Sequence, residues 1–440
     1  MSFRGGLDEE RAIKRLESLK PTITRMLSSS STAGLSYRVL HHGKVIHIDN
    51  FGFRDVDRRL AVDEQTIFPI CSMTKNLVSS ALGIIMHESE DGIQTLNRPL
   101  QEVLSDYNPI PDSMRTSATL ADWMSMRTGT QSYQPWFQSH NNVIFPQEDA
   151  FKIINSLQQV NDLRSQFRYS NWGYELAART IRHLSGQTWD AVLHSRIFEP
   201  LELHRTVAHG DLSAFDNVAE SYTTLDDGTP VHIRRTPLSG ATLLGAGGGV
   251  SSCTEDLLKL YKEVLRACVH QFETGESSTS GSPFKYLNQM MSAQTILPGP
   301  SFRESTYGFG WLRTELPNVM FKISPNLAQL GGAPILGRGS PSKLLIAHYG
   351  SMPGACCGLN LFPETQSAIV VLTNSTPLCD ISDWLCQLLT QTLFDFSHQN
   401  DYISWTEKAV EKEKLWHPNV VRELEAKKVY GTLHRFRKLV

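Results

Sequence analysis

One stretch, Pro69-Ile-Cys-Ser-Met-Thr-Lys75, opens a long apolar segment and decides how the rest of the chain is interpreted. Pro69 is typical of a helix start, and the apolar residues from Leu77 to Met86 predict a buried helix behind it. On that helix Ser72 and Lys75 lie three residues apart on one face, within hydrogen-bonding reach. The pair predicts a serine hydroxyl activated by a neighbouring amine.

This chemistry makes a demand on the amine of Lys75. To accept the serine proton near neutral pH, its pKa must fall by about 3 units from ~10.4, which costs about 4–5 kcal/mol and requires burial or a nearby positive charge. The backbone N–H of Ser72, unpaired in the first helical turn, is also a candidate donor to an oxyanion. The apolar residues that follow along the helix offer a buried setting: Leu77, Val78, Leu82, Ile84 and Ile85.

By itself the Ser-x-x-Lys spacing is weak evidence, because the chain contains it twice more, at 282–285 and 340–343. Both of those copies lie in loops that contain proline. An alternative interpretation makes Ser72 a helix cap and Lys75 a surface charge. Further motifs are needed to choose between the two interpretations.

Two later motifs supply the other polar groups of such a site. Tyr169-Ser-Asn171 precedes the apolar helical run 176–181, and His348-Tyr-Gly-Ser351 ends the apolar strand 344–347. A strand end at a sheet edge can lie alongside a bound substrate. The chain therefore carries Ser-x-x-Lys, Tyr-x-Asn and His-x-Gly, in that order.

This ordered set resembles the serine β-lactamase and penicillin-binding-protein superfamily, in particular its class C-like esterase and transesterase branch. The resemblance extends over about residues 30–395. It implies an α/β (α+β) fold of the β-lactamase/transpeptidase type, in which an antiparallel sheet flanked by helices adjoins a mainly helical subdomain. The other similar segments are Leu120–Gly129, Arg196–Leu203, Ala246–Ser252 and Tyr307–Trp311.

The resemblance also implies roles for the residues of the three motifs. Ser72 is the expected nucleophile, Lys75 its general base, and Tyr169 a second proton carrier that serves the leaving group. An acyl-enzyme on Ser72 follows. The backbone N–H groups of Ser72 and Ser351 are expected to form the oxyanion hole.

Substrate binding is expected from residues in and beside the later motifs. Asn171 is expected to hydrogen-bond the acyl side of the substrate, and His348 to stand where the family has a cationic lysine. Aromatic side chains next to the motifs are candidates for lining an apolar acyl pocket. The expected substrate-binding residues are Asn171, His348, Gly350, Ser351, Trp172, Tyr349 and Trp136.

The histidine at 348 is the main departure from the pattern, because a mostly neutral imidazole holds a substrate carboxylate poorly. The sequence therefore favours a serine hydrolase or acyltransferase that acts on an ester, thioester or amide of an intracellular small molecule, such as a natural-product intermediate. The alternatives are a catalytically inactive scaffold or binding protein of the same fold, and a D-amino-acid peptidase or β-lactamase. Ser72, Lys75 and Tyr169 together favour an enzyme, since a scaffold needs none of them.

The pattern along the chain predicts three parts. Residues 1–33 form a leading amphipathic helix, 34–398 the catalytic domain, and 399–440 a C-terminal appendage that ends in a basic stretch. Within the catalytic domain the sheet takes about 34–95 and 300–398, and the helical part about 96–299. Expected elements are strands at 34–40, 45–53, 342–347, 358–362 and 368–373, and a helix near 381–393.

Composition excludes several classes of protein. The 440 residues carry 42 Lys+Arg against 45 Asp+Glu, a net charge of −3, so the basic surface of a nucleic-acid-binding protein is not expected. The seven cysteines show neither CxxC pairs nor zinc-ligand spacing, and Gly245-Ala-Gly-Gly-Gly matches no complete phosphate-binding fingerprint. No metal and no cofactor are expected. The N-terminal residues resemble neither a secretory signal nor a transit peptide, and no membrane partner is expected. The sequence therefore predicts a cytoplasmic protein. Its expected partner is a small-molecule acyl substrate, and an acyl thioester is a candidate donor.

Overall fold

The computed structural model describes residues 2–132, 142–143, 145–299, 301–320 and 324–429. Within them, one antiparallel sheet is built from two distant parts of the sequence. It has nine strands in the order β3-β2-β1-β15-β14-β13-β10-β9-β8. Their bounds are β1 Gly34–His41, β2 Lys44–Asp55, β3 Leu60–Ala61, β8 Thr295–Ile296, β9 Ser305–Tyr307, β10 Leu312–Leu316, β13 Lys343–Met352, β14 Ala355–Phe362 and β15 Ser367–Thr373.

The centre of the sheet joins the first strand of the chain to the last. Strand β1 pairs antiparallel with β15, from Leu35 opposite Thr373 to Leu40 opposite Ala368. All residues of both strands are buried, and β15 reads as a nearly continuous apolar run, Ser-Ala-Ile-Val-Val-Leu-Thr. Such a run is what a strand covered on both faces requires. The structure confirms the five predicted strands as β1, β2, β13, β14 and β15, each within a few residues of its expected bounds.

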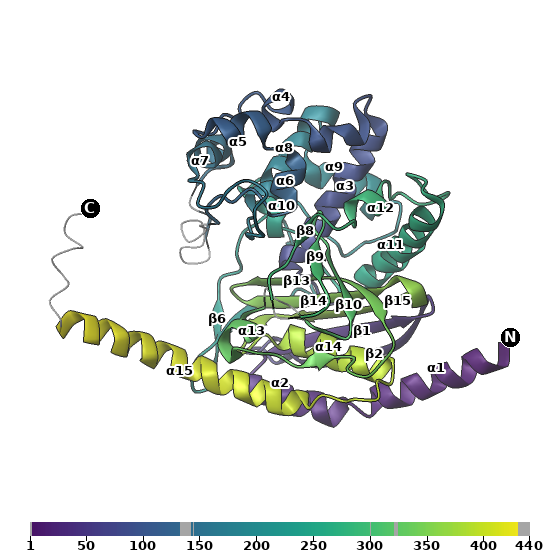
Figure 1. Ribbon diagram of the computed structural model, residues 1–440. Coiled ribbons are helices and arrows are strands. Elements are labelled where there is room, and N and C mark those ends of the chain that lie inside the picture. The colour runs from purple at the N-terminus through teal and green to yellow at the C-terminus, as the bar shows by residue number, and fades with distance from the viewer. Residues whose placement is uncertain (1, 133–141, 144, 300, 321–323, 430–440) are drawn as a thin grey trace.

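Helices cover both faces of this sheet (Figure 1). On one face α14, Ile381–Leu393, packs on β14 and β15, at the position that the sequence predicts. On the other face α11, Thr254–Thr274, packs on β1 and β15. The sequence assigns 254–274 to the helical part, whereas the structure places this helix against the sheet.

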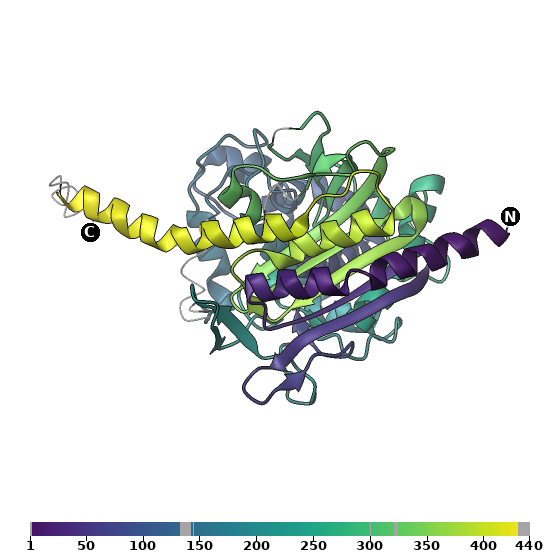
Figure 2. The same cartoon turned by 90° about the horizontal axis from the view of Figure 1, so that it is seen from below.

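The terminal helices lie side by side across the face that α14 covers, as Figure 2 shows. The single leading helix predicted over 1–33 is wrong, because the chain forms α1, Ser2–Glu17, and α2, Lys20–Ser30. Pro21 lies in the first turn of α2, where its missing N–H is tolerated, but it cannot continue the preceding helix. Helix α15, Tyr402–Val429, packs on α2 and then extends beyond the body of the molecule.

The chain between β3 and β8 contains a mainly helical region on the side of the sheet opposite α14 (Figure 1). Gly173 of α8 lets that helix pack directly on α6, since a Cβ there would lie 2.3 Å from the Trp123 carbonyl oxygen. The helices are α3 Thr74–Glu88, α4 Leu100–Val103, α5 Asp112–Ser117, α6 Leu120–Met124, α7 Ala150–Ser156, α8 Trp172–Ser185, α9 Trp189–Leu193, α10 Gly245–Gly248 and α12 Leu287–Met290, with α13 Pro325–Leu330 further along.

Short strand pairs connect the helical region to the sheet. Strand β4, Phe68–Pro69, pairs with β7, Ser251–Ser252, and so joins the chain entering the serine motif to the glycine-rich segment before β7. The motif itself packs on β13 and β14. The motifs therefore meet where the helical region touches the sheet. The remaining short strands are β5 Ser221–Thr224, β6 Pro230–Ile233, β11 Asn318–Val319, β12 Ile335–Leu336 and β16 Ser375–Thr376.

Candidate active site

Ser72 lies in a tight turn that leads into helix α3. Cys71–Met73 forms one turn of 3-10 helix and the α-helix begins at Thr74, so Ser72 precedes the first α-helical turn in which the sequence places it. Cys71 has a φ of 48°, in the left-handed region that non-glycine residues rarely adopt. Strained backbone of this kind is often found at functional sites. Here it directly precedes the hydroxyl that the sequence identifies as the nucleophile.

Lys75 is enclosed, with an exposed fraction of 0 %. Its Nζ donates hydrogen bonds to Ser72 Oγ at 3.0 Å and to the Gly247 carbonyl oxygen at 2.6 Å. Burial lowers the pKa of Lys75 to about 7, the value that the sequence argument demands of a base. No described carboxylate lies within 4.0 Å of this amine, so nothing holds it as a permanent ammonium.

Tyr169 completes the contacts of the serine oxygen. Its hydroxyl donates a hydrogen bond to Ser72 Oγ at 2.9 Å, although the two residues are far apart in sequence. Burial raises the pKa of Tyr169 well above its ordinary value, so the phenol keeps its proton at neutral pH. A neutral phenol beside the nucleophile is suited to donating a proton rather than to removing one.

The glycine-rich segment, residues 245–249, holds the base in place, a role that the sequence did not reveal. Gly247 supplies the carbonyl that accepts from Lys75, and a Cβ on it would lie 3.2 Å from Asn171 Oδ1. The segment begins after Leu244, whose N–H donates to the buried carboxylate of Glu175 at 3.0 Å. The sequence interpretation of this segment as close backbone packing beside the cleft is confirmed. The carbonyl contact depends on backbone geometry, which no residue pattern records.

A cavity of about 290 Å³ opens onto Ser72 and Tyr169, and we call it the catalytic pocket. Gly350 on β13 forms part of its wall, and only glycine fits there, since a Cβ would lie 2.7 Å from the Ser72 nitrogen. This contact brings β13 against the backbone of the nucleophile, as the predicted oxyanion hole requires. The lining residues are Ser72, Tyr169, Ser324, Pro325, Tyr349, Gly350, Ser351 and Asp380.

Two predicted substrate-binding side chains are enclosed in the core instead. His348 and Trp172 have exposed fractions of 0 %, and neither lines the catalytic pocket. His348 Nδ1 donates to the Tyr349 carbonyl at 2.7 Å, which leaves Nε2 to accept from the Tyr307 hydroxyl at 3.1 Å. Burial, together with the charge of Lys75, lowers the pKa of His348 to about 3. The imidazole is therefore neutral, in line with the sequence argument, and the contact of His348 with a substrate stays a prediction.

The other predicted residues are placed as follows. Ser351 is exposed at the pocket, and Tyr349 lines it while donating its hydroxyl to Asn360 Oδ1. Asn171 directly precedes α8 and lies beside Gly247, and its contact with the acyl group stays a prediction. Trp136 lies outside the described residues. Asp380 and Ser324 of the lining were missed, because nothing in the sequence brings 324 and 380 next to 72.

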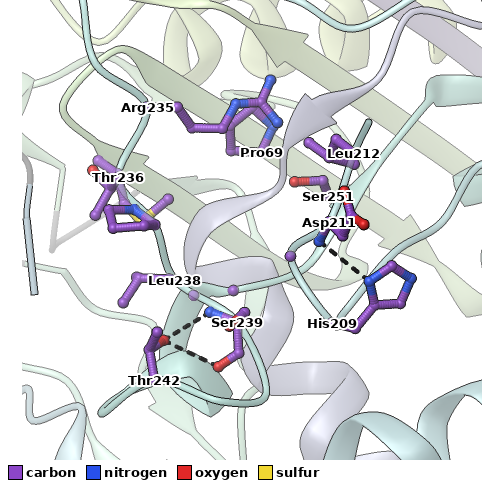
Figure 3. A pocket seen from close by; sticks show the side chains of 15 residues that line it. Pro69, His209, Asp211, Leu212, Arg235, Thr236, Leu238, Ser239, Thr242 and Ser251 are labelled. Atoms are coloured by element: carbon purple, nitrogen blue, oxygen red, sulfur yellow. Dashed lines mark hydrogen bonds between the residues drawn. The ribbon is translucent and has the colours of Figure 1, made fainter. Parts of the chain in front are cut away.

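A second cavity of about 470 Å³ adjoins the same turn and is shown in Figure 3. Pro69, Gly248 and Met352 connect it to the serine motif. Arg235 and Asp211 are its charged lining residues. Arg235 Nη2 donates to the Ala219 carbonyl at 2.6 Å, and burial lowers its pKa to about 10, which still leaves it cationic at neutral pH.

Metal and membrane features were also sought in the described chain. Its His, Cys, Asp and Glu side chains form no group of three or more that could hold a metal ion. None of its helices combines the length and the apolar composition that crossing a bilayer requires. The seven cysteines are free and buried.

A family model described as Beta-lactamase matches residues 19–389, which is most of the chain. The chain belongs to the beta-lactamase family. The Beta-lactamase of Escherichia coli (strain K12) is 21% identical over 361 residues, covering 80% of this chain and 87% of that protein. The octameric penicillin-binding protein homologue from Pyrococcus abyssi superposes with a TM-score of 0.67 at 22% identity, covering 86% of this chain and 77% of its own.

A class C beta-lactamase is similar in structure too, with a TM-score of 0.66 at 17% identity over 88% of this chain and 97% of its own. The fold is therefore the β-lactamase/transpeptidase fold, as the sequence predicts. At this identity the two structural likenesses concern the fold alone. The fold of the beta-lactamase family supports a serine acyl-transfer or hydrolase activity.

The geometry of this beta-lactamase family member allows a consistent proton path. When Lys75 is a neutral amine, an N–H can keep the bond to Gly247 while the lone pair accepts the Ser72 proton. On this path Ser72 Oγ would form a bond to the substrate carbonyl carbon, and the leaving group would take the proton of Tyr169. Lys75, which contacts the same serine oxygen as Tyr169, would return its proton to the phenol.

The lowered pKa of Lys75 predicts a pH dependence of acylation. The active form is the unprotonated amine, so the rate of acylation should rise about tenfold per pH unit below about 7 and level off above it. The raised pKa of Tyr169 predicts that the plateau persists to at least pH 9. Measuring kcat/KM for a p-nitrophenyl ester from pH 5.5 to 9 checks this, after subtraction of spontaneous hydrolysis. A rate that falls as pH rises through 7 would instead mean that the ammonium is the working form.

Proposed function

We propose that this protein is a serine acyl-enzyme catalyst that hydrolyses or transfers the acyl group of an ester, thioester or amide. One observation carries the proposal: Lys75 Nζ and Tyr169 OH both contact Ser72 Oγ, at 3.0 and 2.9 Å, beside a cavity large enough for a small acyl group. A catalytically inactive scaffold would not need a buried amine with a pKa near 7 in contact with a serine.

The neutral state of His348 argues against β-lactam hydrolysis as the main activity. A substrate carboxylate needs a cation or strong donors, and the residue at the position of the family's lysine is an enclosed imidazole. Esters and thioesters make no such demand. The proposed substrate is therefore an acyl ester or thioester of a small molecule, such as a natural-product intermediate, and a cytoplasmic location stays a prediction.

Hydrolysis and transfer share the acyl-enzyme and differ only in the second nucleophile. Water gives an acid, whereas an alcohol or amine bound in the pocket gives a new ester or amide. Adding an acceptor alcohol during turnover of a p-nitrophenyl ester separates the two outcomes by the product formed. The acyl-enzyme itself is common to both and is the claim to be tested first.

A fluorophosphonate probe tests for the reactive serine. The Ser72 oxygen displaces fluoride and forms a stable phosphonate ester, so we expect one label per chain, mapped by peptide mass spectrometry to Ser72. The chain supplies its own controls, because Ser282 and Ser340 have the same spacing to a lysine, but Lys285 and Lys343 are only half-buried. Native protein without label at Ser72, or with equal label at Ser282, would contradict the proposed function.

A further inference from the structure

Asp380 is a carboxylate in the wall of the catalytic pocket that the proposed mechanism does not use. It lies at the N-terminus of α14, where Oδ1 accepts hydrogen bonds from Asp383 N at 3.2 Å and Ser382 Oγ at 2.7 Å. Its Oδ2 accepts from Ser324 Oγ at 3.1 Å. The Ser382 backbone also hydrogen-bonds this carboxylate. Each carboxylate oxygen offers about two acceptor positions, so Oδ2 keeps a position beside Ser324, which lines the same pocket.

Within the described chain, no basic side chain forms an ion pair with Asp380. No lysine, arginine or histidine nitrogen of the described chain lies within 4.0 Å of Asp380. Asp383, in the first turn of α14, is a second buried carboxylate, and its oxygens accept hydrogen bonds from the amides of Asn326 and Gln387. Burial and the neighbouring charge raise the pKa of Asp383 well above its ordinary value, and burial raises the pKa of Asp380 by less, so Asp383 takes up a proton first. The charge that this pair of acids keeps therefore lies at Asp380, and partly buried charges are normally paired.

We propose that Asp380 binds a cationic group of the substrate, so that the compound acylating Ser72 carries an ammonium group within reach of the pocket wall. This inference rests on the proposed function and deepens it by naming a substrate class. An ammonium would take the free acceptor position on Oδ2 and neutralise the charge.

The neighbouring cavity differs from the catalytic pocket because its lining includes a cation as well as a carboxylate. Arg235 lies in the lining of that cavity, as Figure 3 shows, and is cationic at neutral pH. The catalytic pocket has a carboxylate and no arginine in its lining. A substrate with both an ammonium and an anionic group would therefore be oriented by the two cavities. Asp380, which lines the same cavity as Ser72, selects the ammonium for the catalytic pocket.

A purely structural role as a helix cap is the competing explanation, and one substitution separates the two. Asn is as good an N-cap residue as Asp, so Asp380→Asn keeps the start of α14 and removes only the charge. We therefore expect the variant to unfold at nearly the wild-type temperature. A loss of ligand preference in a variant that still folds cannot come from the cap.

Boronic acids supply probes that need no known substrate. The Ser72 oxygen adds to boron to give a tetrahedral adduct, with its proton passing to Lys75. Inhibition constants are compared for 3-(aminomethyl)phenylboronic acid and its neutral isostere 3-ethylphenylboronic acid, and for the matching 4-substituted pair. In wild type we expect the aminomethyl compound of at least one pair to bind about tenfold or more tighter, the gain typical of a charge-assisted hydrogen bond. Asp380→Asn should bring that ratio close to one.

The matched control is Asp211→Asn, which removes a carboxylate from the neighbouring cavity and should leave the ratio as in wild type. Equal binding within both pairs in wild type would overturn the inference and leave the proposed function standing. So would a preference that persists in Asp380→Asn. If none of the four compounds binds, Ser72 is not a reactive nucleophile, and the proposed function falls together with the inference.

Discussion

Replacing Lys75 with methionine is expected to reduce the rate of Ser72 acylation by about 10⁴-fold, to nearly the level of Ser72→Ala. The amine is the sole base in contact with the serine oxygen in the described chain, since Tyr169 keeps its proton. Methionine fills a similar volume without charge, so it suits the dry setting of a side chain with an exposed fraction of 0 %. The loss should therefore be one of chemistry and not of folding.

The measurement is single-turnover acylation by a p-nitrophenyl ester, with thermal unfolding of each variant as the check on folding. Lys285→Met is the matched control, because Lys285 ends another Ser-x-x-Lys motif, at 282–285. This substitution should leave the rate of acylation unchanged. If Lys75→Met acylates within about tenfold of wild type, an activated water or another group serves as base, and the assignment of Lys75 fails.

The elements that the sequence predicted correctly are those whose signal is local. β15 is an unbroken apolar run and α14 has helical periodicity, so burial on both sides can be read from each segment alone. The strands 295–316 were not predicted individually, because β8, β9 and β10 are short and their pairing with β13 is not visible in their composition. The break between α1 and α2 had a local signal in Pro21. The prediction missed it because the helical periodicity continues on both sides of the break.

The residues of the candidate site also separate into those with a local sequence signal and those without one. Ser72, Lys75 and Tyr169 were found from motif order, and the structure brings their functional atoms together. Gly247 could not be found, because its contribution is a carbonyl whose direction depends on a loop far along the chain. The enclosure of the His348 side chain could not be predicted, because a strand position gives no information on which side chains are buried when both faces of the sheet are covered.

The second large effect is expected for Tyr169→Phe, and it should depend on the leaving group. The phenol proton serves a departing alkoxide or amine, so hydrolysis of an alkyl ester should slow by about 10²-fold or more. A p-nitrophenolate leaves without protonation, so the p-nitrophenyl ester should be affected much less. Phenylalanine keeps the ring that packs over the Lys75 amine at 5.2 Å and removes only the hydroxyl.

Comparing kcat/KM for the alkyl and p-nitrophenyl esters of one acid isolates the proton donated to the leaving group, since both substrates give the same acyl-enzyme. Tyr174→Phe is the matched control: this buried tyrosine also lies over Lys75, at 5.4 Å, but its hydroxyl bonds to the Met124 carbonyl and not to Ser72. Its variant should slow both esters by the same small factor. Equal slowing of both esters by Tyr169→Phe would mean that the phenol only positions the serine, and the proton for the leaving group would then have to come directly from Lys75.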